Sequence, residues 1–422
     1  MEETELIPHL FRTEYRKIVS VLCGLFGIEY IEIAEDIVSD TFLMATELWG
    51  LKGLPKSPVP WLYTVAKNKT IDYLRRNTLF AQKIAAEIKK AAPLIEETDI
   101  DLSGKNINDS QLAMMFAICH PCISTEAQIA LSLNLLCGFG AEEIAEAFLT
   151  NKETVYKRLA RAKEKLRAEK VKIEQPSLAE INGRLPVVIT TLYLLFNEGY
   201  YSALQNTTLR KDLCLEAMRL TLLLIENTGT NKPVANALLS LMCFHSSRFE
   251  ARTDKNGEII LYEDQDTSLW NTELINRGEY YLNQASQGSI LSKYHLEAAI
   301  AYWHTKKTNT AEKWENILQL YNKLLQIEYS PIAALNRTYA LAKADGRPDG
   351  THGRGKEAAI IEAEKLKLVN NHLYHLLLGN LYTNYDNVKA LQHLQTALGL
   401  ARSTAEKATI SKSISRLAEP ER

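Results

Sequence analysis

The residues with the clearest chemical potential are cations that recur along residues 152–172. Lysine and arginine side chains donate hydrogen bonds to phosphate oxygens and to base edges, and their charge attracts a nucleic-acid backbone. Apolar residues recur in the same segment at helical spacing, which predicts a helix with one packed stripe. The stripe is Val155, Leu159, Ala162 and Leu166; the cations are Lys157, Arg158, Arg161, Lys163, Lys165, Arg167, Lys170 and Lys172.

Two predicted helices with a tight corner position these cations. Residues 141–148 form a short amphipathic helix, residues 149–151 form the corner, and the basic helix begins near Lys152. Thr150 and Glu153 have the spacing of a capping box. A short helix, a turn and a long basic helix form the pattern of a helix-turn-helix, whose second helix enters the major groove of DNA. A merely solvated charged face is the alternative, and this segment alone does not separate the two.

A second basic segment alternates with aromatic residues along residues 61–83. Rings stack on unpaired bases and cations hold phosphates, so this mixture suits single-stranded DNA. The segment follows residues 50–60, where two glycines and three prolines predict a loop. Packing of Trp61 against a neighbouring helix explains that residue as well as a base contact does. The residues are Trp61, Tyr63, Tyr73 and Phe80 among Lys67, Lys69, Arg75, Arg76 and Lys83.

Acidic residues gather on a predicted helix at residues 31–49, which follows another predicted helix at residues 10–26. The apolar stripe of the acidic helix is Ala34, Ile37, Thr41, Met44 and Leu48, and its acids are Glu32, Glu35, Asp36, Asp40 and Glu47. Such a face is either solvated or a docking surface for a basic partner.

Composition limits the class of protein. The net charge of the 422 residues is only -2, so any DNA contact has to come from local patches. The six cysteines are scattered, as in proteins that keep their thiols reduced. No apolar run reaches transmembrane length and the N-terminus is acidic, unlike a signal peptide. Sparse glycine and proline predict an all-α protein, and we expect it in the cytoplasm.

The chain divides into four predicted parts. Residues 1–84 form one helical unit, and residues 85–111 lose helical periodicity and are predicted to be a flexible linker. Residues 112–172 hold the helix-turn-helix. Residues 173–422 contain successive helical segments, which predict an α-solenoid with a weak 34-residue repeat near its end.

Three blocks, in this order and spacing, resemble the extracytoplasmic-function (ECF) sigma factors of the sigma-70 family. They read AEDIVSDTFLMATELW, WLYTVAKNKTIDYLRR and AEEIAEAFLTNKETVYKRLARAKEKLR. The resemblance implies sigma region 2 in residues 1–84 and region 4 in residues 112–172. It implies promoter-specific transcription initiation, with core RNA polymerase and promoter DNA as partners. The polymerase surfaces would be the β′ clamp helices and the β flap.

The resemblance also assigns binding residues. Residues 50–60 and the helix from Trp61 would read the -10 element, and the helix near Lys152 would read the -35 element. Leu149 departs from the glycine that many members have in the corner. The implied polymerase-binding residues are Asp36, Asp40, Thr41 and Phe42; the -10 residues are Trp61, Tyr63, Lys67, Lys69, Arg75 and Arg76; the -35 residues are Thr154, Lys157, Arg158, Arg161 and Lys165.

The C-terminal part resembles the TPR-like extension of one large ECF group. The matching segments read LYLLFNEGYYS, LYEDQDTSLWN, YHLEAAIAYWH and SPIAALNRTYALAKADG. Control by the fused domain is associated with this group, so the resemblance implies a regulatory protein or ligand at the extension. Two alternatives remain open: a helical interaction scaffold, or a small-molecule sensor that uses the sigma-like part as a tether.

Several polar residues of the C-terminal part could line a site: Asn197, Glu198, Tyr200, Asp264, Asp266, His295 and His304. We favour structural roles for these residues. The segment with Asn197, Glu198 and Tyr200 would be a helix end, the aspartates would cap the next helix, and the histidines would fill gaps between helices. Cys119 and Cys122 form a CxxC pair around His120, but a second ligand pair is missing, so buried thiols are favoured over zinc. The chain has no Gly-rich phosphate loop, nucleophile elbow or HExxH motif, so we expect no enzyme activity, cofactor or metal.

Overall fold

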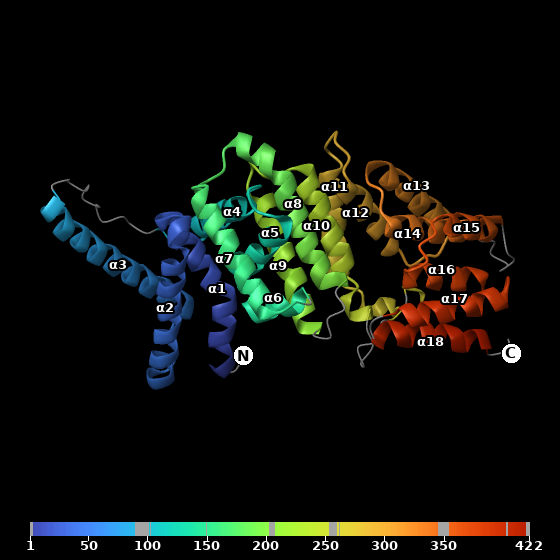
Figure 1. The fold of residues 1–422 in the computed structure, drawn as a ribbon, viewed down its shortest axis with the longest axis horizontal. Helices are drawn as coiled ribbons and strands as arrows, with labels where there is room; N and C mark the ends of the chain where they lie inside the picture. The colour runs from blue at the N-terminus through green and yellow to red at the C-terminus, as the bar shows by residue number, and fades with distance from the viewer. Residues whose placement is uncertain are drawn as a thin grey trace. The chain divides into compact units, whose positions relative to one another are not determined.

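The computed structural model describes most of the chain as helix (Figure 1). The described residues are 3–88, 101, 103–148, 150–201, 207–252, 260, 262–344, 354–401 and 404–418. They contain eighteen α-helices and no strand, which confirms the predicted all-α class. The chain splits into two compact units, Met1–Gly199 and Tyr200–Arg422.

The first unit is built around helix α1. Its buried residues Ile18, Val19 and Leu22 are shielded by the helices that pack against α1, which are α2, α3 and α4. The helices of this unit are α1 (Glu3–Phe26), α2 (Ile31–Lys52), α3 (Pro58–Ile88), α4 (Gly104–Ile118), α5 (Thr125–Leu131), α6 (Ala141–Ala147), α7 (Lys152–Ala168) and α8 (Leu178–Tyr201).

The predicted loop at residues 50–60 is shorter than expected. Helix α2 continues to Lys52, and Gly53 follows it with a φ of 78°, which glycine adopts without strain. Helix α3 begins at Pro58. Prolines are tolerated there because the first turn of a helix does not need their N–H groups. Only five residues, 53–57, therefore separate the two helices.

The predicted linker at residues 85–111 is also shorter. Helix α3 continues to Ile88, while residues 89–100 and residue 102 lie outside the described residues. Helix α4 begins at Gly104, because the Ser103 hydroxyl accepts a hydrogen bond from the N–H of Asn106. Ile107 and Gln111 are buried, so residues 104–111 belong to the packed unit and not to a tether. Their polar composition concealed a capped helix.

The helix-turn-helix has the predicted elements with a different cap. Helices α5 and α6 both pack against α7. The side chain of Asn151, not of Thr150, accepts the N–H of Thr154 at 2.8 Å. Asparagine is a strong N-cap residue, so the cap lies one residue later than predicted. Leu149, where the resemblance suggested a departure, lies outside the described residues.

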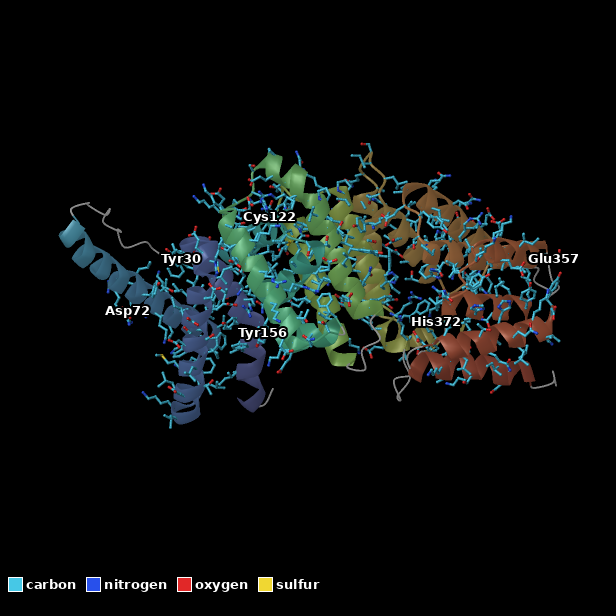
Figure 2. All side chains as sticks on the ribbon, viewed as in Figure 1. Tyr30, Asp72, Cys122, Tyr156, Glu357 and His372 are labelled. Carbon is cyan, nitrogen blue, oxygen red and sulfur yellow. The ribbon has the colours of Figure 1, made fainter. Side chains whose placement is uncertain are left out.

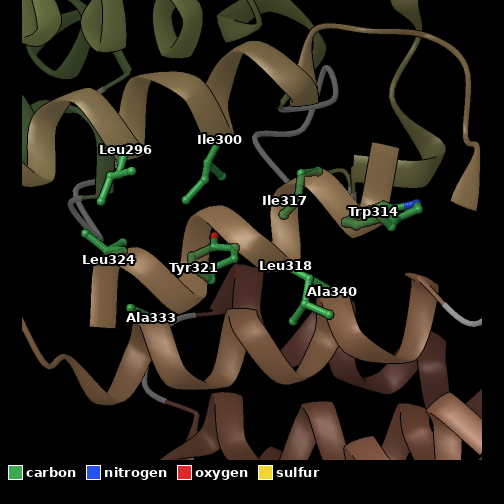
Figure 3. Close-up of a cluster of buried hydrophobic side chains, with 9 residues drawn as sticks. All are labelled: Leu296, Ile300, Trp314, Ile317, Leu318, Tyr321, Leu324, Ala333 and Ala340. Atoms are coloured by element: carbon green, nitrogen blue, oxygen red, sulfur yellow. The ribbon is translucent and has the colours of Figure 1, made fainter. Parts of the chain in front are cut away.

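The second unit is a succession of helices. Most pack mainly against their neighbours along the chain, as helices of an α-solenoid do, while α12 packs most extensively against α10. Figure 3 shows one core layer, in which Trp314, Ile317 and Tyr321 of α13 pack between α12 and α14. The 34-residue repeat stays a prediction. The helices are α9 (Thr207–Glu226), α10 (Pro233–Ser246), α11 (Thr272–Ala285), α12 (Lys293–His304), α13 (Ala311–Ile327), α14 (Pro331–Ala344), α15 (Arg354–Lys365), α16 (His372–Tyr382), α17 (Asn387–Leu400) and α18 (Thr404–Ala418).

Two glycines allow close helix packing in this unit. A Cβ atom at Gly278 of α11 would lie 2.6 Å from the ring of Phe244 on α10. The Ser240 hydroxyl donates to the carbonyl oxygen of Gly278 at 2.8 Å in the same contact. A Cβ atom at Gly379 of α16 would lie 2.7 Å from Leu394 of α17. Glycine therefore fixes the distance between both helix pairs.

Helix α8 differs from one expectation. Among the described helices it is long and apolar enough to cross a membrane by length and composition, with a mean hydropathy of 1.2 over its best window. The expectation that no apolar run reaches that length is therefore wrong for this helix. Core helices pass the same test, and Val188, Ile189 and Leu192 are buried, so the composition is weak evidence for a span.

Candidate nucleic-acid and polymerase interface

Helix α7 presents the predicted -35 residues on one side. At about 100° per residue, its five predicted residues fall on a single face, away from the stripe formed by Val155, Leu159, Ala162 and Leu166. The side chains of Lys157, Arg161 and Lys165 are exposed, and those of Thr154 and Arg158 are partly exposed. Tyr156, labelled in Figure 2, is also exposed on this helix. The face is open to a nucleic acid.

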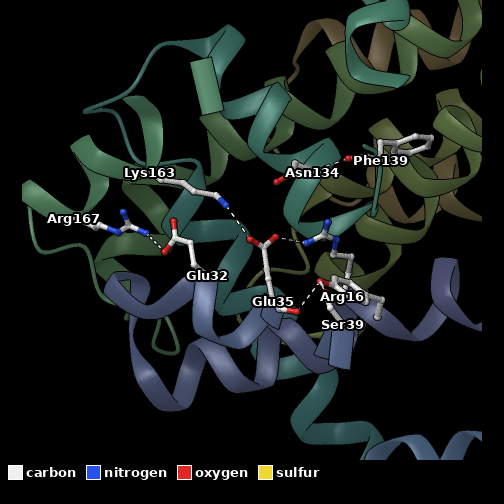
Figure 4. Close-up of polar contacts among 9 residues, drawn as sticks. Arg16, Glu32, Glu35, Ser39, Asn134, Phe139, Lys163 and Arg167 are labelled. Carbon is white, nitrogen blue, oxygen red and sulfur yellow. Dashed lines mark hydrogen bonds and ion pairs between the residues drawn. The ribbon is translucent and has the colours of Figure 1, made fainter. Parts of the chain in front are cut away.

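A third side of α7 binds α2. Figure 4 shows the Glu35 carboxylate between two cations: Lys163 Nζ of α7 lies 3.2 Å from Oε2, and Arg16 of α1 lies 2.7 Å from Oε1. Arg167, one turn after Lys163, pairs with Glu32. Burial raises the pKa of Glu32, but the hydrogen bond and charge of Arg167 outweigh it, so this pKa is lowered. The contact joins the helix-turn-helix to the acidic helix.

The contact with α2 leaves the predicted DNA face uncovered. Lys163 lies about half a turn around α7 from Thr154 and Arg161, because nine residues at about 100° each make two and a half turns. The sequence did not separate these two cationic faces. The spacing of four places Lys163 and Arg167 on one side of α7, but nothing in the sequence identifies α2 as the helix that they contact.

The predicted polymerase-binding residues fall into two pairs. Asp36 and Asp40 are exposed on α2. Thr41 is fully buried and donates to the carbonyl oxygen of Ile37 at 2.8 Å. Phe42 is buried against Phe11, with ring centroids 5.2 Å apart. Phe42 therefore packs against α1, and Thr41 is enclosed within the unit.

An open apolar groove of about 550 Å³ lies beside α2. It is formed by α1, α2 and the residues that precede α6. The exposed side chain of Leu43 lines it together with the buried Phe42. Its other lining residues are Ile7, Phe11, Ser39, Thr46, Cys137, Gly138, Phe139 and Glu143.

The predicted -10 residues are also divided. Arg75 and Arg76 are exposed on α3, while Lys67, Lys69 and Trp61 are partly exposed. Lys69 lies 3.6 Å from Asp40 of α2. The Trp61 ring packs edge-on against Trp49, at 5.3 Å between centroids, and retains some exposed surface.

Tyr63 is partly buried and bonded to α1. Its hydroxyl donates to Glu14 Oε2 at 2.5 Å, and its ring packs against Val21 and Ile107. Burial, followed by the hydrogen bond to the Glu14 carboxylate, raises the pKa of Tyr63. The hydroxyl and one side of the ring are engaged within the first unit, and the side chain remains partly exposed.

The cysteines near the helix-turn-helix are free thiols. Cys119 is buried, and burial raises its pKa to about 12. His120 Nδ1 accepts the backbone N–H of Cys122 at 3.2 Å. Within the described residues, no group of three His, Cys, Asp or Glu side chains could hold a metal ion.

Polar residues singled out in the C-terminal part have structural partners. Asp266 accepts the N–H of Ser268 at 2.9 Å, as a cap, and Asp264 pairs with Arg416 at 3.3 Å. His295 completes a capping box with Ser292. Helix α8 continues through Asn197, Glu198 and Tyr200 to Tyr201, and burial raises the pKa of Glu198. His304 lies between the rings of Tyr262 and Trp314.

Two protein families match this chain. Residues 10–79 match sigma-70 region 2, and residues 184–286 match a family of unknown function, DUF6596. An uncharacterized protein of Rhizobium meliloti (strain 1021) is 30% identical over 396 residues, which cover 92% of this chain and 90% of the relative. No solved structure matches. The region 2 match covers the acidic helix α2 and most of α3, and the second match begins in α8. The chain therefore belongs to the sigma-70 family, with a large C-terminal extension that follows region 2.

Proposed function

We propose that this protein is an RNA polymerase sigma factor of the ECF type that binds core polymerase and directs promoter-specific transcription initiation. Residues 112–172 serve as region 4 and read the -35 element. The fused helical extension regulates the factor. The protein performs no covalent chemistry, because polymerase supplies catalysis, and it acts in the cytoplasm.

The observation that carries the proposal is the free basic face of α7. Thr154 and Arg158 lie near the start of the helix, where recognition helices contact base edges. Lys157, Arg161 and Lys165 add charge along the same side for the phosphates. The opposite side is engaged by Glu32 and Glu35, so the helix has separate protein-binding and DNA-binding faces.

The polymerase contact is assigned to the exposed side of α2. Asp36 and Asp40 present carboxylates to a basic partner, and the exposed Leu43 adds apolar area beside the groove. We assign the β′ clamp helices to this side of α2 and the β flap to residues 112–172. Glu32 belongs to the same acidic helix, so the bond from Arg167 covers one end of this surface.

The -10 contact is assigned to α3. Trp61, Lys67, Lys69, Arg75 and Arg76 keep their proposed roles, since each retains exposed surface. Stacking of an unpaired base on Trp61 and phosphate contacts by the arginines are the interactions expected of such a set.

The test is binding to core polymerase and then to promoter DNA. The protein should co-purify with core enzyme at one to one, and the complex should lose promoter affinity steeply as salt rises. The double variant Arg158→Ala/Arg161→Ala should keep core binding and lose promoter affinity. The matched control, Arg337→Ala/Lys365→Ala, removes two cations that contact Glu362 in the second unit. Equal promoter affinity of the two double variants would remove α7 from the proposal.

A sensor function of the extension is the second candidate. The specific observation in its favour is a pair of enclosed cations around Tyr262, which no carboxylate among the described residues neutralises. Apolar residues would pack at these positions without the free-energy cost of burying a charge, so a purely structural scaffold does not account for the two cations.

A further inference from the structure

Two cations of the second unit are enclosed without a counter-charge from the residues that the structure describes. The side chains of Arg248, just after α10, and of Lys313, on α13, are 8% and 2% exposed. Both lie over the ring of Tyr262, in cation–π contacts at 5.5 Å and 5.3 Å from its centroid. Within the described parts of the chain, neither forms an ion pair with a carboxylate. Enclosing two like charges in this way is costly unless something compensates them.

Their donors are only partly used. Lys313 Nζ donates to the Tyr262 hydroxyl at 2.9 Å and to the carbonyl oxygen of Lys306 at 2.8 Å, which leaves its third N–H. Among the residues that the structure describes, the buried Nε–H of Arg248 has no acceptor. Burial, followed by the charge of Arg248, lowers the pKa of Lys313 to about 8.

Trp270 and His304 also lie at Tyr262, and neither supplies a negative charge. The Trp270 ring stacks 6.4 Å from Tyr262, and its buried Nε1–H has no acceptor there. The His304 ring meets Tyr262 edge-on at 5.1 Å, and its Nδ1 has no partner among the same segments. Burial and the charges of Arg248 and Lys313 lower the pKa of His304 to about 3, so it is neutral at pH 7.

The nearby acids are already committed to other cations. Glu263, next to Tyr262, binds Lys343 at 2.5 Å and accepts the Tyr339 hydroxyl at 3.0 Å. Asp264 pairs with Arg416, and Glu279 pairs with Lys306 at 2.9 Å. The positive potential at Tyr262 is therefore not cancelled from within the described residues.

The cluster is reachable from solvent. Tyr262 and His304 are partly exposed, whereas the Arg248 and Lys313 side chains behind them are enclosed. An anion that reaches Tyr262 would lie near a guanidinium, an ammonium and the indole N–H of Trp270. Charge-assisted hydrogen bonds of this kind are the strong ones, and arginine suits oxyanions because its donors are planar and paired.

We propose that the cluster around Tyr262 is a binding site for a small molecule that carries an oxyanion, a phosphate or a carboxylate group. Arg248 and Lys313 supply the charge, Trp270 and His304 line the site, and Tyr262 positions Lys313. The site lies in the extension. Its test measures anion binding to the full chain directly, so the outcome does not depend on the sigma function.

The experiment is thermal unfolding of the full chain in chloride buffer and at rising inorganic phosphate, at constant ionic strength. Phosphate should raise the melting temperature of the parent chain. Arg248→Met should melt at or above the parent temperature in chloride, since it removes an uncompensated charge, and should lose the phosphate response. Arg337→Met, which loses bonds to Asn322 and Glu362 elsewhere in this unit, should keep the response and so corrects for general salt stabilisation.

Acetate and sulfate arms identify the group that is bound. A response to acetate alone assigns a carboxylate, and a response to phosphate and sulfate assigns a tetrahedral anion. No response to any of the three, or equal responses of Arg248→Met and Arg337→Met, overturns the proposal. If Arg248→Met does not fold, Arg248→Lys takes its place, and anion binding is measured by tryptophan fluorescence. Binding at least tenfold weaker than that of the parent chain supports the site. Unchanged binding overturns it.

Discussion

Lys163 on α7 reaches Glu35 on α2 with 3.2 Å between Nζ and Oε2, and the same carboxylate binds Arg16 on α1. One acid therefore connects three helices of the first unit. The side chains of Lys163 and Arg16 are 13% and 12% exposed, so water hydrates neither charge well. Both cations therefore depend on the Glu35 carboxylate as their charge partner. This contact places a positive side of the helix-turn-helix on the acidic helix.

Glu35→Gln should destabilise the first unit by about 1–3 kcal/mol, because it leaves two poorly hydrated cations without a charge partner. Urea unfolding of the full chain measures this. Glu47→Gln, an exposed acid on the same helix, is the control and should change the free energy of unfolding by less than about 0.5 kcal/mol. Equal effects of the two variants would mean that the bridge contributes nothing.

Arg158→Ala and Arg161→Ala should each weaken promoter binding of the polymerase complex by about 1–3 kcal/mol. Loss of a base contact relaxes the sequence preference. Loss of a phosphate contact lowers the slope of log affinity against log salt concentration by about one. Titration of promoter and scrambled DNA at several salt concentrations distinguishes these effects. Affinities unchanged for both variants at every salt concentration would contradict a DNA-binding role of this face.

Gly278→Ala should destabilise the second unit by about 1–3 kcal/mol, because the new methyl group would overlap the Phe244 ring and push α10 and α11 apart. Gly399→Ala on α17 is the matched control. A Cβ atom there meets nothing within 4 Å, so the change should be neutral or stabilising by up to about 1 kcal/mol. Denaturant unfolding compares them. A neutral Gly278→Ala would show that the two helices adjust freely.

The stability of the second unit should rise between pH 8 and pH 10.5, relative to Lys313→Met. The pKa of Lys313 is lowered to about 8 in the folded chain from 10.5, first by burial and then by Arg248. In this window the unfolded state binds the proton that the folded state has released, so stability rises with pH. The full difference is about 3 kcal/mol. Melting temperatures of both chains across this range, in chloride, give the comparison. A difference that stays constant with pH would refute it.

Local patterns in the sequence predicted which sides of α7 and α2 are exposed. The apolar stripe of α7 determines which side of the helix packs, so the cations on the opposite side follow from residue spacing alone. Asp36 and Asp40 were predicted on the exposed side of α2 for the same reason. The cap of α7 was misplaced by one residue, since Thr150 and Asn151 are both good caps and only backbone geometry selects between them.

Contacts between distant segments could not be predicted in this way. Glu35 and Lys163 are 128 residues apart, and no periodicity relates them. The bond from Tyr63 to Glu14 likewise joins two helices, 49 residues apart along the chain, and no local pattern indicates it. The oxyanion site brings together residues from several segments between Arg248 and Lys313. Only His304 was among the predicted candidates, because the chemistry of the site depends on an uncompensated charge and not on a motif.

Run-off transcription with core RNA polymerase tests the proposed function most directly. Random-sequence selection with the assembled complex first supplies the promoter. The full chain should then produce a transcript of defined start from that promoter, and the Arg158→Ala/Arg161→Ala chain should lose most of it while Arg337→Ala/Lys365→Ala retains it. A full chain that binds core polymerase but gives no defined start on any selected DNA, or transcripts that are insensitive to the α7 double variant, would contradict promoter recognition by this protein.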